Sequence, residues 1–295
     1  MRWRTQVALI CAALLVIGFS RQNVSRVEFL QEYIWDFPTI RWFGGISTIE
    51  TFDNGTRYLA STDKGLMFRG PVLRHETGEI RLMPPRKAWG LLSSRNTRLP
   101  WRLSDTEGMA IAPDGSVFVA FETVARVARY IDTRGPSEII PRPLGFRDLP
   151  NNGGIEALAM DTAGTMYAIP ERFSERGRIP VFRRVQAEWS DTWHVRATPW
   201  LNPVGADVGP DGRLYLLERG LNFLGFRSRL RRWEITETGL ENEEILMDTR
   251  RNRFGNLEGL DVWRDEHGAL RALLVEDNNF WPFNKTSVVD IRLPE

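Results

Sequence analysis

Cysteine, histidine and lysine are all scarce in this chain of 295 residues. The single cysteine, Cys11, excludes a disulfide within the chain and a zinc site built on several thiolates. The three histidines, His75, His194 and His267, lie far apart, so a histidine metal centre and a Ser–His–Asp triad are both disfavoured. Three of the 39 basic residues are lysine and the other 36 are arginine. Chemistry in this chain therefore depends on carboxylates, arginines and neutral polar groups.

A strong charge of one sign is also missing, because the formal net charge is +1. No overall field therefore favours nucleic acid or an acidic partner. The sequence has no G-x-S-x-G nucleophile elbow and no phosphate-binding loop of the G-x-x-x-x-G-K-[ST] form. The 42% of hydrophobic residues and 26% of charged residues are typical of a globular chain that buries a full core.

The N-terminal residues have the pattern of an export signal. Arg2 and Arg4 precede an apolar run over residues 7–19, which has the length of a signal-peptide core and is short for a membrane span. The usual Ala-x-Ala cleavage site is missing, so an uncleaved membrane anchor is the alternative. We expect residues 1–20 to be a signal peptide or anchor and residues 21–295 to form one domain. The expected location is the bacterial periplasm or the exterior, with tethering to the inner membrane as the alternative.

Five stretches repeat one pattern, in which a polar residue opens a strand, a turn glycine follows and a second strand ends in an acid. The openers are Ser47, Glu107, Glu156, Asp207 and Glu258, the turn glycines are Gly55, Gly115, Gly164, Gly212 and Gly268, and the closing acids are Asp63, Glu122, Glu171, Glu218 and Asp277. Openers lie 8, 8, 8, 5 and 10 residues before the glycine, and acids lie 8, 7, 7, 6 and 9 residues after it. Matched arms predict β-hairpins, because both ends of a hairpin return to one edge of the sheet.

A third strand and often a weaker fourth follow each hairpin, and the openers recur every 49 to 60 residues. Repeats of about four strands predict an all-β fold, a single β-propeller, with an irregular β-sandwich as the alternative. The last repeat ends after three strands, so we expect segment 23–33 to supply its fourth strand by pairing near residues 288–293. Five blades are predicted, or six if segment 88–104 hides a degenerate hairpin.

The acids of the repeat are expected to meet. The innermost strand of each propeller blade lines the central channel, so the openers should face one another at one mouth, with the closing acids as a second tier. Many hard oxygen ligands favour a divalent metal, Ca²⁺ ahead of Mg²⁺ or Mn²⁺. The alternative is that the acids pair with arginines such as Arg219 and Arg227, or cap loop amides. The candidate metal ligands are Glu107, Glu156, Asp207, Glu258, Glu122, Glu171, Glu218 and Asp277.

The motifs FGGIS, EGMAIAPDG, GGIEALAMD, NLEGLDVW and VEDNNF resemble the phytase-like domain family, described as having the esterase-like activity of phytase. The resemblance extends from Phe43 to Leu293 and implies a secreted bacterial β-propeller with hydrolase activity. The chain departs from the family at Asp207, where GADVG replaces a Glu-Gly form, and in VEDNNF, where a serine is expected before the aspartate. The recurrent Glu-Gly openers of the family correspond to Glu107, Glu156 and Glu258.

The residues and the resemblance together predict an exported, metal-dependent hydrolase of phosphate esters or other esters. Glu156 or Glu258 would act as the base, and Arg219 would contact an anionic group of the substrate. Two alternatives stay open: a propeller without catalysis that binds a ligand or protein at the same mouth, and a lactonase-like metal-dependent hydrolase. The expected partner is a small ester or phosphate ester. Nucleic acid is not expected, and membrane contact would come only through an uncleaved N-terminal segment.

Overall fold

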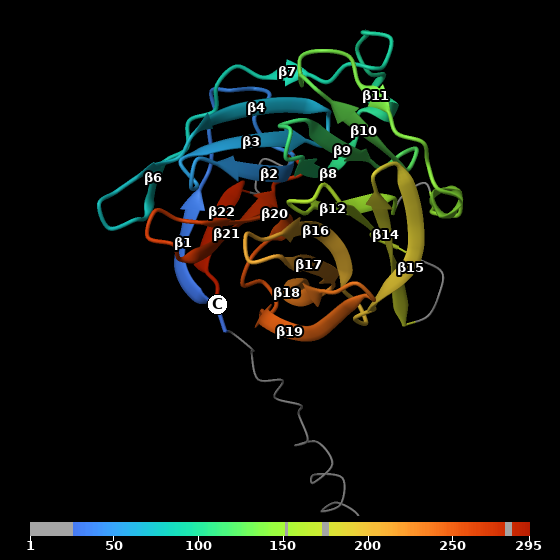
Figure 1. Ribbon diagram of the computed structural model, residues 1–295. Coiled ribbons are helices and arrows are strands. Elements are labelled where there is room, and N and C mark those ends of the chain that lie inside the picture. Colours follow the sequence, from blue (N-terminus) through green and yellow to red (C-terminus); the bar gives the residue numbers. More distant parts are fainter. Residues whose placement is uncertain (1–25, 151–152, 173–176, 281–284) are drawn as a thin grey trace, which may run out of the picture.

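Five four-stranded antiparallel sheets surround a central axis (Figure 1). The computed structural model describes residues 26–150, 153–172, 177–280 and 285–295. The innermost strands of the five sheets contact one another in a closed ring, β2 with β8, β8 with β12, β12 with β16, β16 with β20 and β20 with β2. The prediction of a five-bladed β-propeller is confirmed, and the alternative of a β-sandwich is wrong.

The strands follow one another from the innermost to the outermost position of each blade. Blade 1 contains β2 (Ile46–Phe52), β3 (Arg57–Thr62), β4 (Leu66–Pro71) and β7 (Trp89–Gly90). Blade 2 contains β8 (Thr106–Ile111), β9 (Val117–Phe121), β10 (Arg126–Tyr130) and β11 (Glu138–Ile139). Blade 3 contains β12 (Ile155–Met160), β13 (Met166–Pro170), β14 (Arg178–Val185) and β15 (Glu188–Arg196). Blade 4 contains β16 (Asn202–Val208), β17 (Arg213–Asn222), β18 (Gly225–Ile235) and β19 (Leu240–Asp248).

Blade 5 joins the two ends of the described chain. It contains β20 (Asn256–Arg264), β21 (Leu270–Asp277), β22 (Ser287–Arg292) and, outermost, β1 (Glu28–Ile34). Strand β1 is antiparallel to β22, with Phe29 opposite Ile291 and Tyr33 opposite Val288. Figure 1 shows the blue first strand beside the red last strands. The predicted closure is therefore confirmed.

Segment 88–104 does not form a sixth blade. Its residues Trp89 and Gly90 are the outermost strand of blade 1, paired with β4. Beyond them the segment contributes an isolated bridge between Leu92 and Arg98 and a short 3₁₀ helix, η1 (Trp101–Leu103). The remaining small elements are the two-stranded sheet of β5 (Leu73–Arg74) and β6 (Ile80–Leu82) and the 3₁₀ helix η2 (Leu144–Arg147).

The expected signal peptide or anchor, residues 1–20, lies outside the described residues, as does the start of segment 23–33. Within the described ranges, no helix is both long enough and apolar enough to cross a bilayer.

A β-bulge interrupts every innermost strand at the same point. The register shifts at Ser47, Glu107, Glu156, Val204 and Glu258. A bulge turns the extra residue out of the regular pleat. In three blades glycine follows the bulge, and a Cβ added at Gly205 would lie 2.4 Å from the carbonyl oxygen of Glu258. In blade 2, where glycine follows glutamate, a Cβ added at Gly108 would likewise lie 3.0 Å from the carbonyl oxygen of Glu156, so this pair of residues combines a redirected carboxylate with room for the neighbouring strand.

Candidate functional site

The bulges bring the openers together. Ser47, Glu107, Glu156 and Glu258 line one narrow hollow between the innermost strands. Because the bulge sits at the same level in each blade, these side chains face one mouth of the channel. The structure therefore places four of the five predicted openers in one group.

The placement predicted for Asp207 is wrong. The bulge of the fourth blade is at Val204, which lies eight residues before Gly212, the spacing found in the first three repeats. Asp207 lies three residues farther along β16, where its Oδ2 accepts a hydrogen bond of 2.7 Å from the backbone N–H of Val262. The short spacing of five residues was the signal in the sequence that a different residue opens this repeat.

The placement predicted for Glu218 is also wrong, by one residue. Arg219 lies opposite Asn202 in the ladder, just as Asp277 lies opposite Asn256 in blade 5. Successive side chains of a strand point to opposite faces, so the side chain of Glu218 turns away from the mouth. It is fully buried, with its Oε1 2.6 Å from Nη2 of Arg231. The fourth blade thus presents a cation at the mouth where the other blades present acids.

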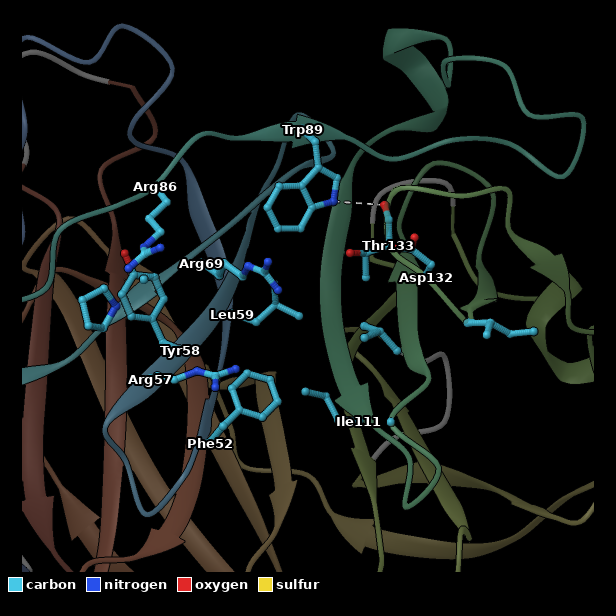
Figure 2. A pocket seen from close by; sticks show the side chains of 15 residues that line it. Phe52, Arg57, Tyr58, Leu59, Arg69, Arg86, Trp89, Ile111, Asp132 and Thr133 are labelled. Atoms are coloured by element: carbon cyan, nitrogen blue, oxygen red, sulfur yellow. Dashed lines mark hydrogen bonds between the residues drawn. The ribbon is translucent and has the colours of Figure 1, made fainter.

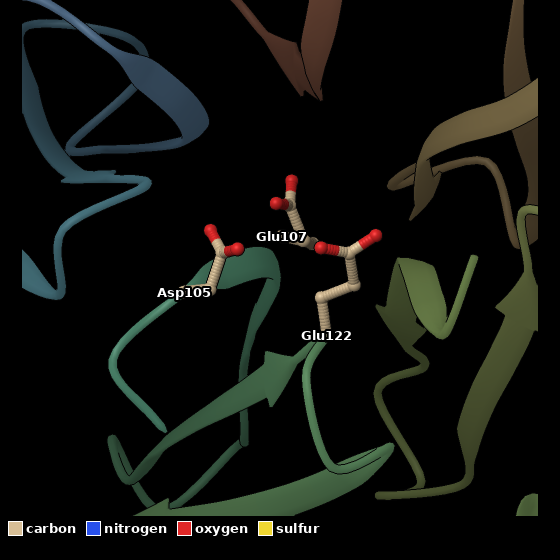
Figure 3. Close-up of side chains that lie close together, drawn as sticks. All are labelled: Asp105, Glu107 and Glu122. Atoms are coloured by element: carbon tan, nitrogen blue, oxygen red, sulfur yellow. The ribbon is translucent and has the colours of Figure 1, made fainter. Parts of the chain in front are cut away.

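Three carboxylates of blade 2 form the tightest acidic cluster. Asp105, Glu107 and Glu122 each offer an oxygen, and these oxygens all lie within 4.8 Å of one another. Figure 3 shows the three side chains rising from the end of the hairpin toward one another. The sequence analysis did not predict Asp105 as a site residue. In the structure its carbonyl oxygen accepts a hydrogen bond of 3.1 Å from the backbone N–H of Glu122, which places the two residues side by side. A polar residue two positions before an opener was the available signal.

Burial and mutual repulsion raise the pKa of Glu107, Glu122 and Glu156. Burial is the main cause for Glu122, with Asp105 next, and the pKa of Glu122 reaches about 7. The pKa of Glu107 lies well above its usual value through burial and then the charge of Glu156. Burial and Glu171 do the same to the pKa of Glu156. We call Asp105, Glu107, Glu122 and Glu156 the mouth group.

Arg219 compensates the acids on the other side of the mouth. Its Nη1 lies 3.0 Å from Oε1 of Glu258, and its Nη2 lies 3.7 Å from Oε1 of Glu171. It also donates a hydrogen bond to Oδ1 of Asn256. Burial still raises the pKa of Glu258 to about 8, with Arg219 opposing that rise. The predicted alternative of acid–arginine pairing therefore describes Glu171, Glu258 and the buried Glu218.

The mouth group differs in this respect. In the part of the chain that the structure describes, no arginine or lysine forms an ion pair with its carboxylates. Arg227, the second arginine predicted to pair with the acids of the repeat, instead pairs with Asp248 at 2.6 Å.

The closing acids Asp63 and Asp277 complete the mouth. Burial raises the pKa of Asp63 to about 7, and Asp277 is the next cause. Asp277 is held by the backbone N–H of Asn279, which donates to its Oδ1 at 2.7 Å, and its pKa rises to about 6 because of burial. Asn278 is engaged with the backbone N–H of Gly45 at 2.9 Å, so its oxygen is not free for a ligand. Asn152 lies outside the described residues.

A separate cleft lies between blades 1 and 2, with a volume of about 630 Å³. Figure 2 shows Phe52, Leu59 and Ile111 within it and Trp89 at its rim, where the indole N–H donates to the carbonyl oxygen of Thr133 at 3.0 Å. Its charged residues are mainly arginines, and none of the mouth acids lines it. The cleft is therefore distinct from the acidic mouth.

Comparisons with known proteins agree with this architecture. An α-L-arabinofuranosidase from Podospora anserina, solved with cellotriose, has a TM-score of 0.54 at 11% identity, with 92% of this chain and 98% of that chain covered. A PQQ-bound aldose sugar dehydrogenase from Streptomyces coelicolor has a TM-score of 0.51 at 11% identity, with 91% and 98% covered. At such identity these two structures show the fold alone. No curated protein matches the chain in sequence.

A family model matches most of the chain in sequence and assigns its family. The model described as "Phytase-like: Esterase-like activity of phytase" matches residues 41–280. This range includes every bulge, the mouth group and Arg219. The chain therefore belongs to the phytase-like family.

Proposed function

We propose that this protein is an exported, metal-dependent hydrolase of phosphate esters or other esters, with its active site at the acidic mouth. The observation that carries the proposal is the cluster of Asp105, Glu107 and Glu122, whose oxygens lie within 4.8 Å of one another. Ca²⁺ takes six to eight oxygen ligands in flexible geometry, so three carboxylates with added water fit it. A bound cation would also relieve the repulsion that contributes to the raised pKa of Glu107, Glu122 and Glu156.

The residues of the mouth divide into distinct roles. Asp105, Glu107 and Glu122 would hold the ion, which when bound supplies a Lewis acid and lowers the pKa of water. Glu156 is 6% exposed and forms no ion pair with a described residue, so it is the better placed of the two predicted bases to accept a proton. Glu258 is held by Arg219 and by the amide of Asn256, which donates to its Oε1 at 2.8 Å. Glu258 would therefore position Arg219 toward an anionic group of the substrate.

The binding-module alternative has one specific observation in its favour. Arg219 pairs with two carboxylates, Glu171 and Glu258, so an arginine–acid network compensates part of the charge of the mouth. Metal binding without turnover on any ester would support that alternative. A panel of phosphate monoesters, carboxylic esters and lactones, each with and without a chelator, separates it from the two hydrolase readings.

Thermal unfolding with and without Ca²⁺ tests the metal site. A ligand that binds only the folded state stabilises it by about 2.7 kcal/mol at a hundredfold excess over the dissociation constant. We expect that gain in the wild type and most of it to be lost in Glu107→Gln and Glu122→Gln. Glu266→Gln is the control, because Glu266 is exposed at the β20–β21 turn. Equal gains in all four proteins would contradict the metal site.

Export is proposed from the N-terminal pattern alone. Cell fractionation with sequencing of the mature N-terminus tests it. A cytoplasmic protein that retains Met1 would contradict it.

A further inference from the structure

A second hollow opens beside Arg219, with a volume of about 660 Å³. Glu171, Arg219 and Asn256 belong both to this hollow and to the acidic mouth, so the two are continuous. The far wall is apolar, formed by Trp200, Leu221 and Phe226. A molecule held at the mouth would extend into this hollow.

Trp200 is the unusual residue of this wall. Its side chain is 87% exposed, and its backbone has φ +67°, which is a genuine outlier for a bulky residue. Gly220 of β17 leaves room for this conformation, because a Cβ added there would lie 1.8 Å from the carbonyl oxygen of Trp200. Strain of this kind is held in place by its surroundings and clusters at ligand sites. The exposed indole gains little from packing in the protein itself, so a ligand is the natural partner for its face.

The polar side chains that line the hollow are three amides, Asn202, Asn256 and Asn279, and three charged groups, Glu171, Arg172 and Arg219, all of which form ion pairs. Arg172 is neutralised by Glu171, with its Nε 3.2 Å from Oε2. Asn202 donates its amide to Glu171 at 3.2 Å, which leaves its Oδ1 as an acceptor. The side chain of Asn279 forms no hydrogen bond to any described residue, although Asn279 lines the hollow. Amide groups and a neutralised guanidinium suit hydroxyl groups, since each can donate or accept.

We propose that this hollow binds a hydroxylated ring of the sugar type, with the ring stacked on Trp200 and its hydroxyls bonded to Asn202, Asn279 and Arg172. This inference rests on the proposed function, because the hydroxylated ring would be the part of the ester substrate that does not react. An aromatic ring could stack on the same indole, but it would leave these polar groups without partners. The polar lining of the hollow therefore favours a hydroxylated ring over an aromatic one.

Oxidation of exposed tryptophans by N-bromosuccinimide, read by peptide mass spectrometry, tests the proposal. The probes are methyl α-D-glucopyranoside, methyl α-L-arabinofuranoside and, as the aromatic arm, benzyl alcohol. Trp101 is the internal control, because it is 79% exposed and lines a different hollow that also reaches the mouth, at Asp63 and Asp105, but has no amide side chain among its described lining residues. A ring stacked on the indole covers one of its two faces, so at saturation a glycoside should slow oxidation of Trp200 about twofold or more. Oxidation of Trp101 should not change.

Two variants complete the test. Trp200→Ala should lose glycoside binding in calorimetry, whereas Trp101→Ala should keep it, and both should keep the wild-type response to Ca²⁺. Failure of both glycosides to protect Trp200, equal protection of both tryptophans, or protection by benzyl alcohol alone would overturn the sugar assignment. Protection of Trp200 in a protein that does not respond to Ca²⁺ would instead overturn the metal site and leave the subsite standing.

Discussion

The mouth group and the acids inside the propeller differ in their partners. We call Asp207, Glu218 and Asp261 the interior group. Asp261 accepts hydrogen bonds from the backbone N–H of Thr51 at 3.1 Å and from its hydroxyl at 2.6 Å. Asp207 accepts from Val262, and Glu218 pairs with Arg231. The mouth group has few donors of this kind: the backbone N–H of Gly153 donates to Glu122 at 3.0 Å.

The difference follows from the backbone. In blades 4 and 5 the acid three positions beyond the bulge accepts a backbone N–H of the next innermost strand, so Asp207 and Asp261 connect neighbouring blades. Residues at the bulge are directed into the channel, where each meets another carboxylate. Protein donors offset part of the cost of burying a carboxylate, although burial still raises the pKa of Asp207, Glu218 and Asp261. A buried carboxylate without such donors is unfavourable unless it is protonated or binds a cation. A carboxylate on an innermost strand therefore either links two neighbouring blades or faces the channel as a candidate ligand, depending on its position relative to the bulge.

The pH dependence of stability should show the largest effect. The pKa of Glu258 is about 8 in the folded protein, against about 4.3 in an unfolded chain, and the pKa values of Glu107 and Glu156 are raised as well. The folded state therefore holds more protons between these values. Without a cation, the free energy of unfolding should fall from pH 4.5 to pH 8, by about 1.4 kcal/mol per pH unit for each excess proton.

Urea unfolding at several pH values measures this slope, and saturating Ca²⁺ should reduce it by removing the contribution of the carboxylates that hold the ion. A free energy of unfolding that rises over that pH range without a cation would contradict the raised pKa values.

Loss of an interior ion pair should have the next largest effect. Glu218→Ala leaves the guanidinium of Arg231 buried, with Glu243 at 3.1 Å as its remaining acidic partner among the described residues. Breaking a buried pair from one side costs about 3–5 kcal/mol. Denaturant unfolding should show that loss, while the gain in stability from Ca²⁺ should stay at the wild-type value. A reduced response to Ca²⁺ would mean that Glu218 belongs with the mouth group after all.

Removal of the hydrogen bonds by which Asp261 links two blades should have a smaller effect. Asp261→Ala leaves the backbone N–H and the hydroxyl of Thr51 without their acceptor, which costs about 1–3 kcal/mol for a buried group. Thr51→Val removes the hydroxyl alone and should cost less. The free energy of unfolding of both variants checks this order, and a larger loss in Thr51→Val would contradict it.

The smallest effect is expected at the exposed end of blade 5. Glu266 is 81% exposed, so Glu266→Gln should change stability by no more than about 0.5 kcal/mol. It should also leave the response to Ca²⁺ and the pH slope unchanged. A lost response in this variant would show that the cation binds away from the mouth.

Much of the architecture could be predicted from the sequence alone. The turn glycines Gly55, Gly115 and Gly164 all have positive φ, at 76°, 83° and 82°, as hairpin turns require. Matched arms then implied hairpins, and their repetition implied blades. The missing last strand implied closure by β1, since an unpaired edge would otherwise remain. These features follow from turn residues, from arm lengths and from the number of strands in each repeat, so no tertiary contact was needed to infer them.

The membership of the site was decided by tertiary structure. A shift of one residue moves a side chain to the other face of a sheet, so an acid-rich stretch does not by itself show whether Glu218 or Arg219 reaches the mouth. The bulge at Val204 depends on close packing of β16 against β20, which requires Gly205 beside the carbonyl of Glu258. Asp105 joins the site only because the hairpin ladder places it opposite Glu122. The sequence determined the repeating hairpins, and the packing of blades around the axis decided which acids meet.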